Sequence, residues 1–525
     1  MKAGKNSGIM SLTKLSKLLL RVGCLLCVSM PAQAAGPVQL QVNLDTVSFE
    51  DFLGVNAVYQ AFAWMPESKA KGFNEADIQR ELDRIERMEL NIARTWYRPD
   101  WAVGDNTIAG PFDWESPKMK AFYTWLSAMQ ELDVDVALQA GWGFTKDTHT
   151  GREFSDPDRD PAEYAAWVSE SVHQIVNVRG FDNVKYLILM TEPTTSPWAD
   201  RPEEKPWPKH VLAKRGENEP EDLELWPYYV KVMRGLHEKM VKDGTRKLVQ
   251  FVGPNNHAVN SFDDLRLSES VAELADILDI YGAHSYLPPE NAYEGWQGFM
   301  DKVRTALSAK PKPIWLDEYN VLKEWEHHVR DQPAHGTYIA ELIAASLDAK
   351  IQNTMIWSLF DQQYPGPRST TDGENSFYDG VHRWGTAKFP YDTQENPTEP
   401  YPVWYAFSML SKYLGGGVGT KVYECQGADG IRINAIEQTD GTWRVLVINS
   451  NAEAKSFNMQ FSRDFGGSLQ RHLYDPAKVQ VSEAATIPRV DKTFQNVASS
   501  LVDTLPAGAV AVYVGVNRST AGGAD

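Results

Sequence analysis

Two glutamates stand at the ends of strongly apolar segments and offer a pair of carboxylates for acid–base and nucleophilic chemistry. Glu192 lies in the run 184–193, and Glu318 lies in the run 313–320. Both runs are short, rich in β-forming residues and closed by a proline or a polar turn, as is typical of buried parallel strands. A carboxylate just past such a strand faces the end of a barrel where enzymes of this architecture carry out their chemistry. The pair therefore indicates an acid and a nucleophile.

Strand-like segments alternate with amphipathic, helix-like segments over most of the chain, which predicts a parallel α/β fold. Asn74 and Asp160 indicate two helix starts. Eight repeats predict a (β/α)8 TIM barrel, longer than the typical ~250 residues because of loop insertions. Glu192 then lies on the fourth strand and Glu318 on the seventh. The expected strands are 52–56, 91–96, 134–140, 184–192, 247–252, 277–284, 313–318 and 354–360, and the expected helices include 75–90, 119–132, 161–178, 226–243 and 336–349.

Two long insertions follow the fourth and eighth predicted strands, at 194–225 and 361–402. Both leave the carboxyl ends of strands, so we expect both to wall the active face of the barrel. The last barrel helix is expected to end near Leu410, and the glycines at 415–417 indicate a hinge.

A second domain is predicted after that hinge, because short alternating or apolar segments follow one another without helices between them. This pattern favours a small antiparallel β-sandwich. Residues 38–44 also alternate cleanly, so the segment 35–48 is a candidate partner of the sandwich. The predicted organisation is a signal peptide at 1–34, a catalytic barrel at 35–412 and a sandwich at 413–525, with sandwich strands at 430–437, 442–449, 456–461 and 509–514 and a loose tail at 516–525.

The first 34 residues have the composition of a secretory signal. Five basic residues lead into an apolar stretch from about Leu18 to Met30, followed by the small-x-small pattern of Ala32 and Ala34. That stretch is too short for a permanent membrane span, and no later segment holds about 18 uninterrupted apolar residues. We therefore expect an exported protein, secreted or periplasmic, with no membrane partner after cleavage. Only Cys425 would then remain, too few for an internal disulfide.

The formal net charge of −18 becomes −23 once the five basic residues of that leader are removed. Such a surface repels nucleic acid and anionic membranes, so neither is an expected partner. The sequence has no His-x-His, His-Glu-x-x-His or calcium-loop spacing, and His327–His328 lies in a polar stretch typical of a solvated face. It also lacks nucleotide-binding glycine motifs and the Gly-x-Ser-x-Gly of α/β-hydrolases. We therefore predict neither a metal nor another cofactor.

Six of the predicted strands carry, in order, a residue or short motif that matches a known pattern. These are Gly54-Val55-Asn56, Arg94, Thr191-Glu192-Pro193, His284-Ser285-Tyr286, Asp317-Glu318-Tyr319 and Trp357, on the first, second, fourth, sixth, seventh and eighth strands. Over about residues 45–412 the chain thereby resembles the clan A glycoside hydrolases, the (β/α)8 retaining glycosidases that include the family 5 cellulases and mannanases. Each motif alone is weak, and the specificity of the match comes from their order.

The resemblance implies roles for the two glutamates and their neighbours. Glu192 resembles the acid/base, which protonates the glycosidic oxygen and later activates water. Glu318 resembles the nucleophile, which attacks the anomeric carbon to give a glycosyl-enzyme. Tyr286 looks like the phenol that hydrogen-bonds the nucleophile, and Arg94 looks like the buried cation beside it. From the residues alone, Tyr286 could instead be the polar end of a buried strand and Arg94 a structural ion-pair partner.

Other residues of the pattern are candidates for substrate binding. The resemblance implies that His284 and Trp357 form a subsite around the reacting sugar. Trp142, after the third strand, is as consistent with packing as with a platform that stacks on a sugar. The clan usually has Asn before the acid/base, where its amide binds the 2-hydroxyl of the sugar, but this chain has Thr191. That contact could be weaker here or be made by Asn255 or Asn256, after the fifth strand.

The chemistry of paired carboxylates is consistent with these roles. Carboxyl groups about 5–5.5 Å apart permit double displacement with retention, whereas an inverting pair needs about 6.5–9.5 Å to admit a water. Glu318 must be ionised, which a neighbouring Arg94 favours, and Glu192 must begin protonated. The two environments must therefore differ.

The sequence predicts a secreted retaining glycoside hydrolase that cleaves β-glycosidic bonds of a polysaccharide or oligosaccharide, with the long strand-end loops favouring endo action. The glycan stays open among mannan, glucan, xylan, agar and carrageenan. Two alternatives also stay open, a non-catalytic carbohydrate-binding barrel and a transglycosylase on the same scaffold. The sequence leaves the oligomeric state and the role of the sandwich undetermined.

Overall fold

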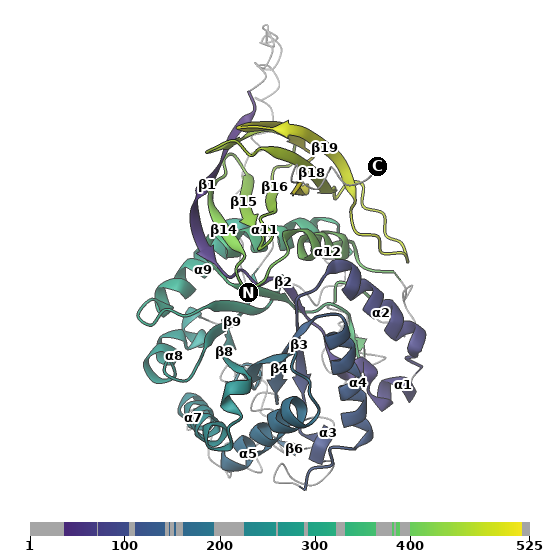
Figure 1. Cartoon of the computed structure of the whole chain (residues 1–525), viewed down its shortest axis with the longest axis vertical. Coiled ribbons are helices and arrows are strands. Elements are labelled where there is room, and N and C mark those ends of the chain that lie inside the picture. The colour runs from purple at the N-terminus through teal and green to yellow at the C-terminus, as the bar shows by residue number, and fades with distance from the viewer. Residues whose placement is uncertain are drawn as a thin grey trace, which may run out of the picture. The chain divides into compact units, whose positions relative to one another are not determined.

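Eight parallel strands close into a barrel within the part of the chain that the computed structural model describes (Figure 1). This part comprises residues 36–70, 72–103, 111–141, 146–147, 152–153, 161–193, 225–258, 261–287, 292–321, 331–363, 381–382, 385–388 and 399–516. The strands follow one another around the barrel in chain order, and the last pairs with the first. They are β2 (Gly54–Val58), β3 (Ile92–Tyr97), β4 (Asp135–Ala140), β7 (Val184–Leu189), β8 (Gln250–His257), β9 (Ile280–Leu287), β10 (Ile314–Val321) and β11 (Asn353–Ile356).

Helices surround this barrel and include all five that the sequence pattern predicted (Figure 1). Asn74 caps the first of the five: its side chain accepts a hydrogen bond from the Ala76 amide at 2.9 Å, and its own amide donates one to the Asp77 carboxylate at 3.1 Å. The other predicted start, Asp160, lies outside the described residues. Among the described residues, no helix is long and apolar enough to cross a bilayer. The main helices are α2 (Glu75–Met88), α4 (Pro117–Glu131), α5 (Pro161–Val172), α7 (Leu225–Asp243), α8 (Leu267–Glu273), α9 (Ala292–Leu307), α11 (Ala334–Asp348) and α12 (Pro402–Leu414).

The fifth and sixth barrel strands lie further along the chain than predicted. Residues 246–248 form a short 3-10 helix instead of the start of a strand, and β8 continues through Pro254 to His257. The predicted strand ended at Val252, because the residues that follow it are polar or proline and normally end a strand. Pairing with β9 extends the strand, because Pro254 lies opposite Gly282 and His257 opposite His284. This extension carries His257 to the end of the barrel where the predicted catalytic residues lie.

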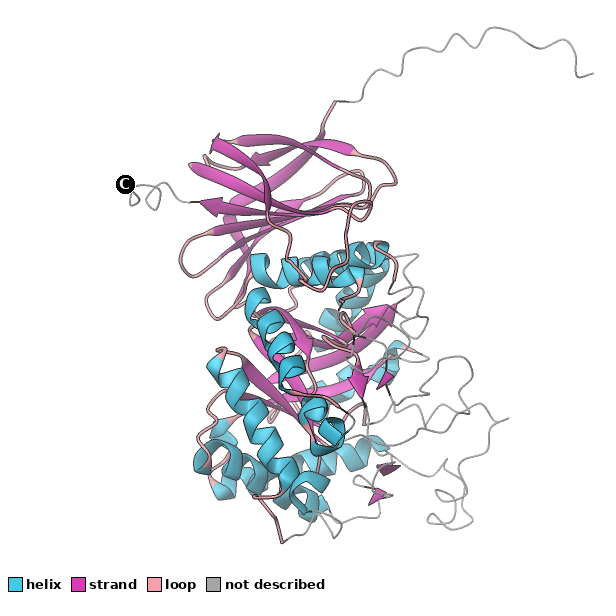
Figure 2. Cartoon of the chain, turned by 90° about the vertical axis from the view of Figure 1, so that its right-hand side faces the viewer, coloured by secondary structure: helices cyan, strands magenta, loops and turns pink. Residues whose placement is uncertain are grey.

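The C-terminal region forms a nine-stranded, mostly antiparallel sheet that curves over its own core (Figure 2). The N-terminal strand β1 (Val38–Glu50) is part of it, antiparallel to one neighbour and parallel to the other. The predicted class, a TIM barrel with an antiparallel β-sandwich, is confirmed. In spatial order the strands are β19 (Val490–Val497), β18 (Gly467–Tyr474), β21 (Val510–Val516), β16 (Trp443–Asn449), β15 (Ile431–Glu437), β14 (Lys421–Gln426), β1, β17 (Lys455–Phe461) and β20 (Ser500–Leu505).

The sandwich packs directly on the barrel. Thr337, in α11, donates a hydrogen bond from its hydroxyl to the carbonyl of Gly508 at 2.6 Å. The glycine segment at 415–417 lies against β2, where a Cβ on Gly416 would be 2.4 Å from the backbone nitrogen of Gly54. Only glycine allows so close a backbone approach, so the predicted hinge is a tightly packed connection. The last barrel helix also runs beyond Leu410, since α12 ends at Leu414.

A carboxyl group is buried between the barrel and helix α2. Glu81 is 4% exposed and accepts a hydrogen bond from the Tyr59 hydroxyl at 2.7 Å. Tyr59 in turn accepts one from the indole of Trp64 at 2.8 Å. Burial raises the pKa of Glu81 from 4.5 to about 8, so the folded protein holds this carboxyl neutral at pH 7.

This buried acid should make folding less favourable as the pH rises. Between about pH 4.5 and pH 8 the unfolded chain has released the Glu81 proton while the folded protein keeps it. The unfolded state then binds fewer protons, so the free energy of unfolding falls with pH, by up to about 1.4 kcal/mol per pH unit for one group. Glu81→Gln removes the titration and retains a hydrogen-bonding side chain. In urea unfolding from pH 5 to pH 8, the free energy of unfolding of the variant should rise relative to that of the wild type. A difference between the two that does not change with pH would contradict the assignment.

Candidate active site

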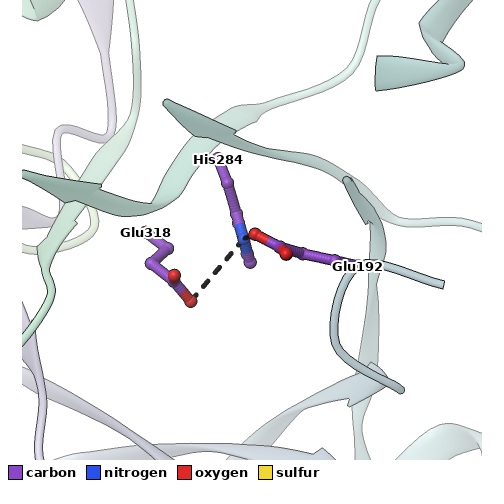
Figure 3. A group of neighbouring side chains, drawn as sticks. All are labelled: Glu192, His284 and Glu318. Atoms are coloured by element: carbon purple, nitrogen blue, oxygen red, sulfur yellow. Dashed lines mark hydrogen bonds and ion pairs between the residues drawn. The ribbon is translucent and has the colours of Figure 1, made fainter. Parts of the chain in front are cut away.

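Strands β7 and β10 carry Glu192 and Glu318 to one end of the barrel. Glu192 follows the end of β7, and Glu318 lies within β10. One carboxylate oxygen of each glutamate and a ring nitrogen of His284 all lie within 4.8 Å of one another. Figure 3 shows the three side chains converging from separate segments. The separation of the two carboxylates is close to the about 5–5.5 Å of retaining pairs and shorter than the about 6.5–9.5 Å of inverting pairs.

Glu318 is held by two donors at the base of the site. Arg94 Nη1 donates to Glu318 Oε2 at 2.9 Å, and the Tyr286 hydroxyl donates to Oε1. Arg94 is fully buried and Glu318 is 5% exposed. Burial alone raises the pKa of Glu318, but the charges of His284 and Arg94 and the bond from Tyr286 outweigh it and hold that pKa below its usual value. The carboxylate is therefore ionised at neutral pH, as a nucleophile requires.

His284 lies between the two glutamates and has no exposed surface. Its Nδ1 is 2.9 Å from Glu192 Oε1 and 3.6 Å from Glu318 Oε2. Burial alone lowers the pKa of His284, but the negative charges of Glu318 and Asp317 outweigh it and raise that pKa to about 9. The imidazole is thus a cation at neutral pH. Among the described residues its hydrogen bond and ion pairs are to the carboxylates, while its predicted role in a sugar subsite stays a prediction.

Irregular backbone aims these side chains. Opposite β9, residues 316 and 318 of β10 pair with consecutive residues of the partner strand, so Asp317 forms a β-bulge. Met190 and Glu192 both adopt the left-handed conformation, with φ of 61° and 45°. That conformation costs a non-glycine residue about 1–2 kcal/mol, and it occurs here at the residue that carries the second carboxylate. Regular strands would point neighbouring side chains to opposite faces, whereas these departures re-aim them.

Gln139, next to the last residue of β4, connects the surroundings of the two glutamates. Its side-chain oxygen accepts hydrogen bonds from Arg94 at 2.5 and 2.9 Å. Its side-chain nitrogen donates to the Met190 carbonyl at 2.9 Å and to the Thr191 hydroxyl. Thr191 is therefore tied to the barrel interior, at the position where the clan usually has an asparagine. The sequence did not identify Gln139, because a glutamine in an apolar strand can equally be an isolated buried amide.

The remaining predicted residues are buried side chains near the site or lie outside the described residues. Asn255 and Asn256 are fully buried, and the Asn255 amide donates to the Met190 carbonyl at 3.0 Å, which supports the backbone before Glu192. Trp357 is 5% exposed and packs against Trp96, with ring centroids 4.9 Å apart. Trp142 lies outside the described residues.

His257 and the side chain of Asp317 were also missed. The extension of β8 places His257 Nδ1 3.9 Å from Glu192 Oε1, with its side chain 19% exposed. Its ring meets that of Tyr286 edge to face at 5.0 Å, and burial lowers the pKa of His257. A histidine just after a strand-like segment is a signal that could have identified it. Asp317 lies fully buried beneath His284, 3.7 Å from Nε2.

Solved structures of glycoside hydrolases share this fold. The GH30 xylanase C catalytic domain from Talaromyces cellulolyticus is 14% identical, covers 91% of this chain and 100% of its own, and has a TM-score of 0.59. A monomeric beta-xylosidase from Caulobacter crescentus CB15 is 12% identical, covering 92% and 100%, with a TM-score of 0.59. A GH39 enzyme from Xanthomonas axonopodis pv. citri is 13% identical, covering 92% and 98%, also at 0.59.

No protein-family model matches the sequence, and no curated protein matches it significantly. Identities of 12–14% establish the fold alone. That fold extends over almost the whole of each solved structure, including both the barrel and the sandwich. The chain therefore has the (β/α)8 architecture that its resemblance to clan A glycoside hydrolases predicts.

The ion pair between Arg94 and Glu318 should be tightly coupled, because both groups are buried. Arg94→Met leaves a buried carboxylate with His284 as its remaining charged neighbour, and we expect it to lower the free energy of unfolding by up to about 3–5 kcal/mol. In a Glu318→Gln background the same substitution should cost less, by at least about 0.5 kcal/mol. Urea unfolding of the wild type, both single variants and the double variant at pH 7 measures this difference. Equal costs in the two backgrounds would contradict a coupled pair.

Proposed function

We propose that this protein is a retaining glycoside hydrolase in which Glu318 is the nucleophile and Glu192 the acid/base. The observation that carries the proposal is the approach of two carboxylate oxygens to within 4.8 Å at one end of the barrel. Their surroundings differ, because Arg94 and Tyr286 donate hydrogen bonds to Glu318, whereas Glu192 lies against the imidazole of His284. The fold shared with GH30 and GH39 enzymes supports the same reading.

The geometry supports a double displacement. In the first step a Glu318 oxygen bonds to the anomeric carbon as the glycosidic C–O bond breaks, and the Glu192 proton passes to the leaving oxygen. In the second step a water oxygen bonds to that carbon, its proton passes to Glu192, and the ester bond to Glu318 breaks. Two inversions leave the configuration unchanged. Tyr286 and Arg94 stabilise the nucleophile as a carboxylate before attack and as a leaving group afterwards.

The proposed substrate is a β-linked polysaccharide or oligosaccharide cleaved by endo action. Support for endo action comes from the sequence, in the long insertions at 194–225 and 361–402, which lie largely outside the described residues. Named activities of the structural neighbours are xylanase, beta-xylosidase and glucosidase, so xylan and β-glucan come first in a substrate screen. Mannan, agar and carrageenan complete the panel.

We also propose that the protein acts outside the cytoplasm. The support is the basic lead, the apolar stretch and the small-x-small pattern in residues 1–34, which lie outside the described residues. Cell fractionation with an antibody to the sandwich would locate the protein, and sequencing its amino terminus would find the cleavage position. Retention of residues 1–34 in the cytoplasmic fraction would contradict export.

Substitution of either glutamate should abolish most turnover while glycan binding survives. We expect Glu192→Gln to lower kcat by about 10²–10⁴-fold on a glycan that the wild type hydrolyses, since general acid–base catalysis contributes that much. Glu318→Ala should lose more, because no covalent intermediate can form. Product sizing and reducing-end assays on the panel measure both. Near-normal rates in both variants would overturn the site assignment.

Two further tests sharpen this assignment. Azide added to Glu318→Gly should yield a glycosyl azide of inverted anomeric configuration, which identifies the nucleophile specifically. Glu81→Gln is the matched control, because it makes the same change from glutamate to glutamine at another buried position, in α2, and it should keep wild-type kcat. If the wild type binds glycans of the panel but hydrolyses none, the protein is a carbohydrate-binding barrel instead.

A further inference from the structure

Asp317 is a buried carboxyl group that the double displacement does not use. It is 0% exposed, and neither of its side-chain oxygens accepts a hydrogen bond from the described residues. A carboxylate without such partners is costly to bury unless a positive charge lies nearby. The nearest recorded basic group is His284, whose Nε2 is 3.7 Å from Asp317 Oδ2, an ion-pair distance rather than a hydrogen bond.

The local backbone places this carboxyl group next to Nε2 of the imidazole. The bulge at Asp317 lets two consecutive acidic side chains approach the same ring, Asp317 at Nε2 and Glu318 at Nδ1. Across the strand pair, Gly282 leaves room for the carboxyl group, since a Cβ there would be 3.0 Å from Asp317 Oδ1. Arg94 Nη1 donates to the Asp317 carbonyl at 2.6 Å, which fixes the bulged backbone.

His284 is therefore enclosed by three carboxyl groups. Glu192 comes from the segment after β7, and Asp317 and Glu318 come from β10. The other titratable groups that face this cluster are Arg94 from β3, His257 from β8, Tyr286 from β9 and Tyr229 from α7. Burial and the charge of Asp317 raise the pKa of the Tyr229 phenol, so that group is neutral. Among the described residues, the cations next to the cluster are thus His284 and Arg94.

The charges of this cluster balance in both halves of the proposed reaction. Before attack, Glu318 and Asp317 are negative, Arg94 and His284 are positive, and Glu192 carries its proton. After attack, Glu318 is an ester and Glu192 is negative, so the sum is again zero. A neutral His284, or the loss of the Asp317 charge, would unbalance both states in a site where buried charge is costly.

We propose that Asp317 and His284 form a positioning pair, in which Asp317 holds His284 as a cation whose Nδ1–H serves the two catalytic carboxylates in turn. Nδ1, which carries a single hydrogen, is 2.9 Å from Glu192 Oε1 and 3.6 Å from Glu318 Oε2, so a small shift directs that hydrogen to whichever carboxylate is charged. Asp317 faces the opposite nitrogen, Nε2, and keeps its proton in place. The alternation of this hydrogen bond between the two glutamates rests on the proposed function, whereas the positive charge of His284 does not.

A titration of His284 tests the pair without any substrate. The full-length protein would be labelled with ¹⁵N-histidine, and the His284 signals would be identified by their absence from His284→Gln. In the wild type both ring nitrogens should stay protonated through pH 7 and lose a proton near pH 9. Asp317→Asn removes the charge but keeps the shape, and we expect it to lower that midpoint by about 1–3 pH units. Glu81→Gln, the loss of a distant buried carboxyl, should leave the midpoint unchanged.

Each outcome decides the proposal. A neutral His284 at pH 7 in the wild type overturns it, even if Asp317→Asn fails to fold. An unchanged midpoint in a folded Asp317→Asn variant, judged by its urea transition, also overturns it. On a hydrolysed glycan, Asp317→Asn should lower kcat with little change in KM, because Asp317 is buried away from the substrate, and the reverse pattern would refute positioning. If His284 titrates near pH 9 and Asp317→Asn lowers that midpoint, but the protein hydrolyses no glycan, the proposed function is refuted and the ion pair is supported.

Discussion

The contact between Arg94 and Glu318 is the constraint on which the geometry of the site depends. Both groups are buried, and a lone carboxylate there would gain a proton rather than remain a nucleophile. Arg94 also donates hydrogen bonds to the backbone of Asp317 and the side chain of Gln139. One guanidinium therefore holds the bulged backbone of β10 and the Gln139 amide in place and also stabilises the charge of Glu318. Its planar fork suits this task, since it presents several donors in a rigid plane.

The barrel alone would not bring these groups together. Side chains alternate along regular strands, and an unbroken β10 would turn Asp317 and Glu318 to opposite faces. The bulge at Asp317 and the left-handed residues beside Glu192 break that alternation where three strands meet around His284. Other departures from regular geometry occur in the sandwich, as register shifts between β1 and β14 and between β18 and β19, but the bulge at Asp317 and the left-handed residues aim the side chains of the site.

Much of the fold could be predicted because its signals are local. Apolar runs indicated all eight barrel strands, and their order placed Glu192 and Glu318 at one end. Contacts that depend on pairing were not predictable from local pattern. The stretch from Pro254 to His257 reads as a turn, and only its pairing with β9 makes it strand. Gln139 has no local signal that distinguishes a network residue from an isolated buried amide.

The site also lowers stability, and the surrounding structure must compensate. An aspartate whose side chain accepts no hydrogen bond from the described residues and a left-handed glutamate each lower the free energy of unfolding. Natural proteins depart from consistent local rules mainly where function requires it. These departures lie at one end of a closed barrel, whose strands have no free edges. The sandwich packs on α11, the helix that follows β10 in the described chain. Left-handed residues and buried polar atoms without partners also occur elsewhere in the described chain, so the approach of the two carboxylates, rather than the strain alone, indicates that this cluster serves chemistry.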